Sequence, residues 1–381
     1  MSQRLTLAEI FRAKRSEFLQ EFGAKISAYQ KRALWLLANC QTAALGGRVV
    51  ECDKCGHREY RFNSCRHRGC PQCEGAKEAK WLLARESELL PTHYFHLVFT
   101  ISHILNELML HNQRVCYAAF FQSVAKTLMT IGKSRLKAQL GFFSILHTWG
   151  QQLDLHPHLH CVVPGGGLAL DGTSWIPTSK KRRYFAPTKV LAEVFRGIFI
   201  KALKRLYYQG ELTFEGTADD FEALLNLAVK RTWVVHAQPP FDSALCVLKY
   251  LARYTRKVAL SNSRLVEFEN GKVTFSFKDY ADGSQSKLCQ MRANEFIRRF
   301  LMHIPPPGFV RIRYYGFMAG PKRKARMEQI KELILGLLPE IIVQQPETDD
   351  SFNPGCCPKC GTKLPPLAMQ APKTPWKIDS S

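Results

Sequence analysis

The stretch that decides the fold is HPHLHCVVPGGG, residues 156–167. We expect a strand here, because the Cys-Val-Val run suits a buried core and the glycines end the pattern. Side chains two apart in a strand point to the same face, so His158 and His160 project together. Two imidazoles at this spacing can share one divalent metal ion. The alternative is a pair of histidines that only line a polar face.

A second strand is predicted at 142–149, and a short turn of Gly, Gln and Asp joins it to the histidine strand as a hairpin. Two histidines leave an octahedral Mg²⁺ ion short of ligands, so a third protein ligand is expected. His147 is favoured, because it lies on the neighbouring strand and can face the pair. A histidine there that only forms a hydrogen bond within the sheet is the other reading. Three rivals for the third position remain: Gln151, Asp154 and His156.

A second signal comes about ninety residues later, in a segment with good helix formers and no internal Gly or Pro. Tyr250 and Tyr254 are four apart and therefore lie on one helix face, one turn from each other. Cations surround them, and positive charge favours the phenolate form of tyrosine, which is a nucleophile. A tyrosine stripe that belongs to the core is the alternative. The surrounding cations are Lys249, Arg253, Arg256 and Lys257.

Two Cys-x-x-Cys pairs within 22 residues predict a structural zinc site, since each pair forms a turn whose thiolates reach one tetrahedral ion. The simplest ligand set is Cys52, Cys55, Cys70 and Cys73. Cys65 and His67 are left over, as alternates or as part of a second site. Basic residues within this module also predict contact with DNA phosphates.

The C-terminal tail carries Cys356, Cys357 and Cys360, of which the last two form half of a zinc site. No second pair follows them. Either this half-site stays incomplete, or it completes a site with Cys65 and His67 of the N-terminal module.

The bulk composition indicates a polyanionic partner, because 54 Lys and Arg residues against 32 Asp and Glu give a net charge of +22. No apolar run reaches the ~18–20 residues of a membrane span, and no signal-peptide core is recognisable. We therefore expect a cytoplasmic, nucleoid-associated protein with no membrane partner. Thirteen cysteines in such a reducing compartment indicate metal ligands or buried thiols and not disulfides.

The ordered set of motifs resembles one family, the rolling-circle transposases of insertion sequence family 91, which are HUH (His-hydrophobic-His) endonucleases. Family members often carry a histidine directly before the cysteine that corresponds to Cys70. This chain has Gly69 at that position, which favours a four-cysteine zinc site. The motifs are SCRHRGCPQC (64–73), ILHTWGQQLDLHPHLHCVVPGGG (145–167), QPPF (238–241), YLARYTRKVALSNSRL (250–265), FKDY (277–280), EFIRRFL (295–301) and RIRYYGFMA (311–319).

The resemblance implies an α+β catalytic domain with a central antiparallel sheet, flanking helices and both histidines on the middle strand. It implies Mg²⁺ or Mn²⁺ at the histidines, single-stranded DNA at transposon ends and target as substrate, and a 5′-phosphotyrosine intermediate on Tyr250 or Tyr254. A homo-oligomer stays open. The domains then predicted are a zinc-binding N-terminal module at 1–90, the HUH catalytic domain at 91–340, and an acidic linker with a cysteine-containing tail at 341–381.

The pattern of cations and aromatic residues predicts where a single strand would be held. Arg311 and Arg313 alternate with apolar residues on a strand and share one face. We expect Arg253, Arg256 and Arg313 to contact phosphates near the active site. The alternative is a strand whose tyrosines fill the core and whose arginines are only solvated.

Two other functions were weighed against a transposase. A plasmid or phage replication initiator of the HUH class would use the same chemistry, and the whole-chain order of motifs with the zinc module disfavours it. A non-catalytic zinc DNA-binding protein would not need both the histidine and the tyrosine pairs. An acid-triad nuclease has little support, because Asp154 has no evident carboxylate partner.

Overall fold

The computed structural model describes residues 5–73, 88–178, 186–238, 241, 259–280, 282–337 and 359. At its centre is a five-stranded sheet in the order β13-β5-β6-β3-β9, with every neighbouring pair antiparallel. The histidine strand is the middle strand, as the resemblance implied. The strands are β3 (Tyr94–Thr100), β5 (Gly141–Trp149), β6 (Leu155–Pro164), β9 (Val234–Ala237) and β13 (Ile312–Gly316).

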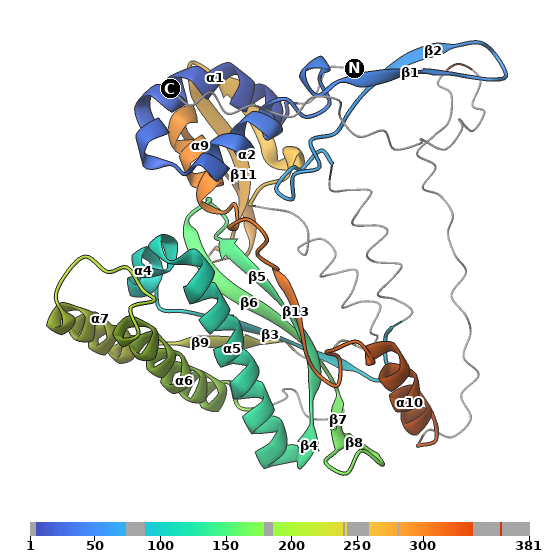
Figure 1. The fold of residues 1–381 in the computed structure, drawn as a ribbon, viewed down its shortest axis with the longest axis vertical. Coiled ribbons are helices and arrows are strands. Elements are labelled where there is room, and N and C mark those ends of the chain that lie inside the picture. Colours follow the sequence, from blue (N-terminus) through green and yellow to red (C-terminus); the bar gives the residue numbers. More distant parts are fainter. Residues whose placement is uncertain are drawn as a thin grey trace.

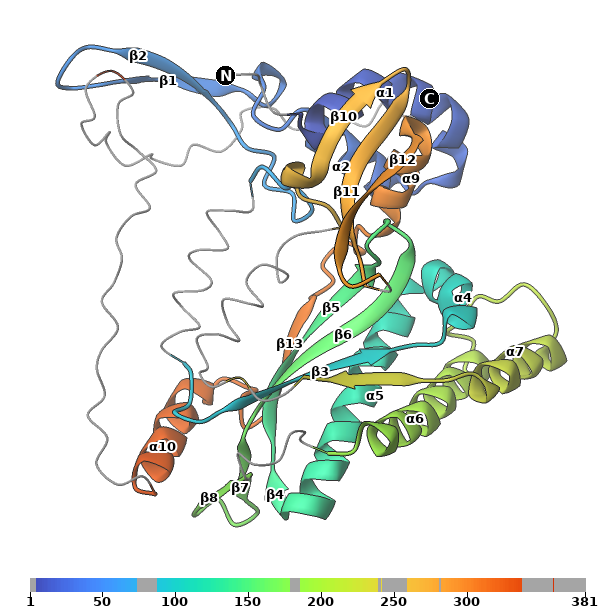
Figure 2. The same ribbon diagram turned by 180° about the vertical axis from the view of Figure 1, so that it is seen from behind.

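Helices cover one face of this sheet, in front of it in Figure 1 and behind it in Figure 2. Alternate strand residues such as Leu97, Phe99 and Leu159 point to this face and are buried among aromatic rings of the helices. Phe195 of α6 lies 5.4 Å from Phe99, ring centre to ring centre. The helices are α4 (Asn106–His111), α5 (Gln113–Ile131), α6 (Thr188–Tyr208) and α7 (Ala218–Lys230).

The opposite face of the sheet carries His158 and His160. Towards its far end, Ile145 and Val162 pack in a smaller core with Phe317 and with α10 (Arg323–Leu335). A three-stranded sheet beside it contributes Trp175 to the same core. Its strands are β4 (Ala138–Gln139), β7 (Gly166–Ala169) and β8 (Trp175–Pro177).

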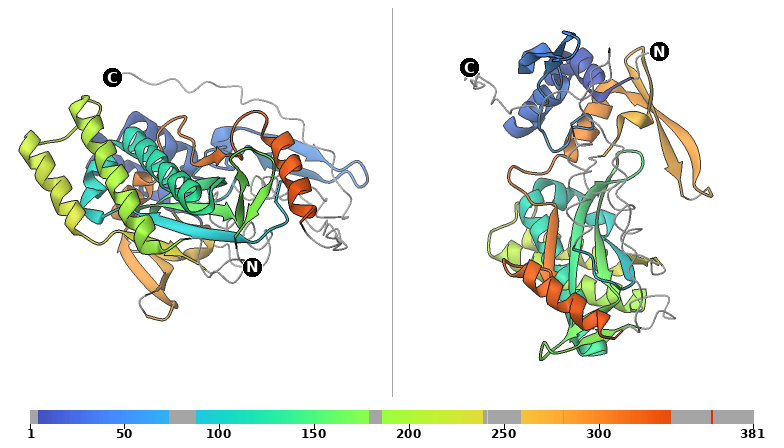
Figure 3. Two further views of the ribbon diagram at one scale, coloured as in Figure 1. Left: turned by 90° about the horizontal axis from the view of Figure 1, so that it is seen from below. Right: turned by 90° about the vertical axis from the view of Figure 1, so that its right-hand side faces the viewer.

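A second lobe lies beyond the β5–β6 turn, and its core joins the N-terminal helices to segments late in the chain (Figure 3). Phe11 meets Phe300 edge to face, with ring centres 5.4 Å apart. The first two predicted domains, 1–90 and 91–340, thus share this core. Its elements are α1 (Leu7–Phe22), α2 (Ala28–Ala38), β10 (Leu265–Glu269), β11 (Lys272–Asp279), β12 (Gln285–Arg292) and α9 (Ala293–Met302).

Local signals in the sequence account for several element boundaries. The capping box at the start of α1 is formed, with the Thr6 side chain accepting from the Glu9 backbone N–H. Asn270 and Gly271 both have positive φ, at 50° and 70°, so they make the tight turn between β10 and β11. The helices α4 and α5 are separate, because Asn112 leaves the helical conformation between them.

A hairpin of β1 (Gly47–Glu51) and β2 (Arg58–Phe62) extends away from the second lobe (Figure 1). Short helical turns connect the larger elements at 23–25, 43–45, 103–105, 132–136 and 262–264. No helix in the described ranges combines the length and apolar character that a membrane crossing requires.

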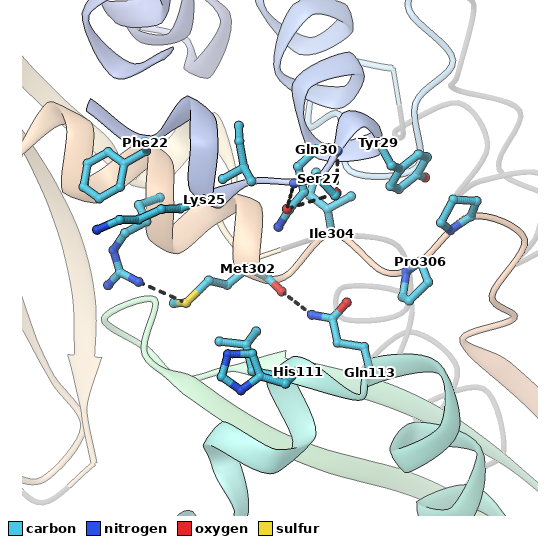
Figure 4. Close-up of a pocket in the computed structure, with 14 residues that line it drawn as sticks. Phe22, Lys25, Ser27, Tyr29, Gln30, His111, Gln113, Met302, Ile304 and Pro306 are labelled. Atoms are coloured by element: carbon cyan, nitrogen blue, oxygen red, sulfur yellow. Dashed lines mark hydrogen bonds between the residues drawn. The ribbon is translucent and has the colours of Figure 1, made fainter. Parts of the chain in front are cut away.

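The two lobes meet at a hollow of 660 Å³ between α2, α9 and the α4–α5 region (Figure 4). The Gln113 side chain donates to the Met302 backbone oxygen across it, at 3.1 Å. None of the three histidines predicted as metal ligands lines this hollow. The hollow lies between the two lobes and does not belong to the candidate site.

Candidate functional site

Three histidines converge on the face of the central sheet that is opposite to α5 and α6. His147, His158 and His160 each bring a ring nitrogen within 4.8 Å of the others. Their ring centres are separated by 4.4 Å (147 to 160), 4.9 Å (158 to 160) and 5.3 Å (147 to 158). His147 and His160 are buried, and His158 is half-buried. The cluster can therefore hold one metal ion at the edge of the core.

Strand register explains why these three meet. His147 on β5 pairs directly with His158 on β6, and paired residues lie on the same face. His160 follows two residues later on the same face. The β5–β6 ladder is irregular between His147 and Trp149, immediately beside the cluster. An irregularity of this kind redirects side chains, and it occurs often next to active sites.

The protonation of the cluster suits metal binding. The His158 Nδ1 donates to the backbone oxygen of His156 at 2.6 Å, which leaves the lone pair of a neutral ring on Nε2. Burial lowers the pKa of His158 to about 4 and the pKa of His160 well below its ordinary value. Both rings are thus neutral at pH 7, the form in which imidazole binds metals.

The second lobe holds the end of β5, the strand that carries His147. Trp149 stacks on His147 with ring centres 4.6 Å apart, and it also contacts His303 at the end of α9. The His303 ring is hydrogen bonded to Thr148 at 3.2 Å and to the Leu153 backbone oxygen at 3.2 Å. The orientation of His147 therefore depends on packing between the lobes.

The rivals for the third position lie elsewhere. Gln151 is in the turn, where its backbone oxygen accepts from Arg264 at 2.5 Å. The His156 ring is exposed, with its centre 5.2 Å from the His158 ring. Neither Asp154 nor His156 belongs to the converging group. Among these candidates, only His147 joins the pair.

Four cysteines form a second cluster, within the second lobe. The sulfur atoms of Cys40, Cys65, Cys70 and Cys73 all lie within 4.8 Å of one another. Cys73 is 3.2 Å from Cys40 and 3.4 Å from Cys65, sulfur to sulfur. Four thiolates around zinc lie about 3.8 Å apart, since Zn–S bonds are about 2.3 Å in a tetrahedron. The donor set and its spacing fit a closed zinc site.

The closeness of the four sulfur atoms shifts the pKa values of these thiols. Hydrogen bonds from the neighbouring sulfurs, Cys40 first, raise the pKa of Cys65 and lower that of Cys73. Four adjacent sulfurs cannot all carry negative charge unless a cation neutralises them. Zinc would supply that charge and deprotonate the remaining thiols.

The cluster contains half of the predicted zinc set. Cys70 and Cys73 belong to the cluster, but Cys52 and Cys55 lie in the β1–β2 hairpin, in a small cluster with Val50. There the Gly56 N–H donates to the Cys52 oxygen, in a tight turn that Gly56 allows through its φ of +66°. The two pairs are close in the sequence but separate in the structure, because the hairpin carries one pair away from the other.

Cys40 is the member of this cluster that the sequence analysis did not name. It lies directly after α2 and is 2% exposed. Its only signal in the sequence is a single cysteine at a helix end, 25 residues before Cys65, and such a signal has no local motif. Cys65 is a member of the cluster and not a spare residue, while His67 lies outside it and accepts from the Gly69 N–H at 3.1 Å.

Two families of known proteins match this chain. A family described as "Putative transposase" matches residues 141–326, and one described as "Transposase zinc-binding domain" matches residues 10–101. A putative transposase, y4qJ, of Sinorhizobium fredii is 44% identical over 336 residues, which cover 86% of this chain and 84% of that protein. The chain belongs to the transposases of insertion sequence family 91.

Other relatives of the transposase are more distant. The transposase for insertion sequence element IS801 of Pseudomonas savastanoi pv. phaseolicola is 28% identical over 337 residues, covering 85% of this chain and 80% of that protein. The solved structure of the conjugative relaxase TrwC in complex with oriT DNA aligns at 14% identity, covering 67% of this chain and 96% of that chain, with a TM-score of 0.25.

The remaining predicted site residues of the transposase divide into two groups. Tyr250, Tyr254, Arg253 and Arg256 lie outside the described residues, as do Cys356, Cys357 and Cys360. Arg313 is described, but it pairs with Ser144 on the helix-covered face of the sheet. Its guanidinium lies over the rings of Phe121 and Phe309, 4.4 Å and 5.1 Å from their centres. A phosphate contact of Arg313 beside the histidines is therefore not supported.

Proposed function

We propose that the transposase cleaves single-stranded DNA at the three-histidine cluster and keeps the cleaved 5′ end covalently on Tyr250 or Tyr254. The convergence of His147, His158 and His160 within 4.8 Å carries this proposal, because it gives three imidazole nitrogens for one ion. A divalent Mg²⁺ or Mn²⁺ ion held by these nitrogens would polarise the scissile phosphate and orient it.

The covalent step would run as follows. The phenolate oxygen of one tyrosine attacks the phosphorus, the bond from phosphorus to the 3′ oxygen breaks, and that oxygen takes up a proton as a 3′-hydroxyl. The new phosphotyrosine ester keeps the energy of the phosphodiester. A later 3′-hydroxyl can therefore reverse the step on a new strand without ATP. With two tyrosines one helical turn apart, one would hold an end while the other cuts.

The histidine site keeps part of its coordination sphere for substrate. Three protein nitrogens leave an octahedral ion with other positions, which phosphate oxygens and water would fill. Arg253 and Arg256 would bind neighbouring phosphates, since arginine forms bidentate contacts with phosphate oxygens. The net charge of +22 would raise the local concentration of DNA around the site.

We further propose that Cys40, Cys65, Cys70 and Cys73 bind a structural zinc ion. Three of these side chains belong to the core that α1, α2 and α9 share. The ion would therefore hold the chain after α2 against the segment at 65–73 and keep the second lobe folded.

An oligonucleotide assay tests the catalytic proposal. Wild-type protein with Mn²⁺ and a single strand from an element end should form an adduct that survives denaturation and maps to Tyr250 or Tyr254 by peptide mass. The double variant Y250F/Y254F should form none, and Y208F, at a 64% exposed tyrosine on α6, serves as the matched control. An adduct of undiminished yield in the double variant would disprove the proposal.

The single variants ask whether both tyrosines are needed. Y250F and Y254F should each cleave but fail to complete strand transfer, because one residue must hold the first end. Full strand transfer by either single variant would show that one tyrosine is sufficient.

A further inference from the structure

A fourth histidine lies against the cluster without belonging to it. His96 on β3 is stacked with His160, with ring centres 5.1 Å apart and planes at 3°. The His96 Nε2 and the His160 Nδ1 are 2.8 Å apart, which is a strong hydrogen bond. His96 is 1% exposed, so this contact is shielded from water.

The sheet register creates this contact. His160 pairs with Val98 across the β3–β6 ladder, and His96 lies two residues further along β3 on the same face. Diagonal neighbours at this distance touch when their side chains are long enough. His96 thus contacts the Nδ1 of the His160 ring, on the side away from the other two histidines.

Two residues that follow β9, Gln238 and Phe241, hold the strand segment around His96 in place. The Gln238 backbone N–H donates to the His96 oxygen at 3.1 Å, and the Phe241 N–H donates to the Tyr94 oxygen at 3.0 Å. The Phe241 ring lies 6.5 Å from the His96 ring, centre to centre. Burial lowers the pKa of His96 to about 4, and a side-chain hydrogen bond with Gln238 opposes part of that shift.

These contacts determine which nitrogen carries each proton. The Nδ1 of His160 faces the Nε2 of His96, which leaves Nε2 as the nitrogen of His160 that can bind a metal ion. A neutral imidazole that offers the lone pair of Nε2 to a metal carries its proton on Nδ1. The Nδ1 of His160 must then be the donor to His96. The lone pair of His160 is left on Nε2, which becomes its ligand atom.

We propose that His96, held by Gln238 and Phe241, is a positioning residue that fixes the proton position and orientation of His160 and thereby sets the affinity of the histidine site for its divalent ion. This inference rests on the proposed function of the histidine site. It also gives a role to Gln238 and Phe241, which the chemistry of cleavage leaves unused. Metal-ligating histidines commonly donate their other nitrogen to such a partner, whose loss weakens metal binding.

Mn²⁺ affinity of the full-length protein tests this role, measured by the electron paramagnetic resonance of free Mn²⁺ during titration. The variant H96F removes the acceptor but keeps a ring, and it should weaken Mn²⁺ binding about 10- to 100-fold. H96Q supplies an amide oxygen in place of Nε2 and should recover most of the affinity. Q238L, one contact further out, should weaken binding by less than H96F does.

A spectroscopic readout separates positioning from folding. Visible absorption of bound Co²⁺ should change in H96F and be restored towards wild type in H96Q. T178V is the matched control, because it removes a buried hydrogen bond to His93 without touching the cluster. T178V should bind Mn²⁺ as the wild type does.

The outcomes distinguish the two proposals. If H158A loses Mn²⁺ binding while H96F and Q238L bind as tightly as wild type, the role of His96 is disproved and the histidine metal site stands. If H158A also binds Mn²⁺ as wild type does, the proposed metal site itself fails. Should H96F not fold, as judged by its thermal transition, Q238L and H96Q decide the question.

Discussion

The two clusters of metal-binding side chains differ in chemistry and in what encloses them. The four cysteines offer soft sulfur ligands in a complete tetrahedral set within the core of the second lobe. The three histidines offer nitrogens on a sheet face, with His158 half-buried. A closed set stabilises a fold, whereas an incomplete set can take part in chemistry. Enclosure and ligand type together therefore assign different roles to two clusters of similar size.

The largest effect is expected at the cysteine cluster. C70S should lose one zinc equivalent per chain and more than about 4 kcal/mol of unfolding free energy, since losses of this size accompany removal of a structural metal. Zinc content by mass spectrometry and thermal unfolding measure the two quantities. C55S, at the cysteine pair outside the cluster, is the matched control and should keep the zinc that C70S loses. Equal zinc loss from this cluster in both variants would restore the original four-cysteine assignment.

The histidine cluster should respond in the opposite way. H158A should lower the rate of oligonucleotide cleavage about a thousandfold, about 4 kcal/mol of transition-state stabilisation. Its thermal stability should stay near that of wild type, because a half-buried histidine contributes little packing. Single-turnover cleavage and a thermal scan on the same sample measure both. A variant that cleaves normally, or that unfolds like C70S, would remove the distinction between the clusters.

Acid should weaken the contact between the lobes near His147. Burial lowers the pKa of His303 to about 4 from an ordinary value of 6.5, so the unfolded chain binds its proton more readily. His303 therefore contributes its full stability above pH 6.5 and loses it as the pH falls towards 4. Between pH 6.5 and 5 the loss is up to about 2 kcal/mol.

Urea unfolding of wild type and H303Q at these two pH values measures this difference. The wild type should lose more stability on acidification than the variant, which has no titrating ring at this position. Identical pH dependence in the two proteins would show that His303 does not carry the acid sensitivity.

The smallest effect concerns the arginines. R313A should cost about 1 kcal/mol of stability through the lost cation–π contacts and leave the salt dependence of single-strand binding unchanged. R253A/R256A should instead reduce the slope of log affinity against log salt by about 1.4, or about 0.7 for each phosphate contact. Fluorescence anisotropy at several salt concentrations measures the slopes. A reduced slope in R313A would return this arginine to the DNA interface.

Local patterns predicted the central sheet well. The alternation around His158 and His160, the capping box at Thr6 and the Asn270-Gly271 turn each depend on neighbouring residues, so a single sequence contains them. His147 could be chosen because a short hairpin brings its strand beside the histidine strand. These inferences needed little knowledge of distant contacts.

The errors arose where distant segments meet. Cys40 joins the cluster only because α2 packs in the second lobe, a contact that no spacing along the chain reveals. For Arg313, the alternation was correct, but the sequence could not tell which face of β13 would be covered by α5. A shift of one residue in the pairing register moves the side chains of a strand to the opposite faces of the sheet. Only the packed structure therefore determines which face is buried.

One measurement tests the division of roles most directly. Zinc-loaded protein is dialysed against EDTA, then supplied with Mn²⁺, while zinc content and oligonucleotide cleavage are followed in the same sample. The account predicts that EDTA abolishes cleavage, that Mn²⁺ restores it, and that the zinc of the cysteine cluster stays bound throughout. Cleavage that persists without added divalent ions, or that returns with zinc alone and not with Mn²⁺, would contradict it.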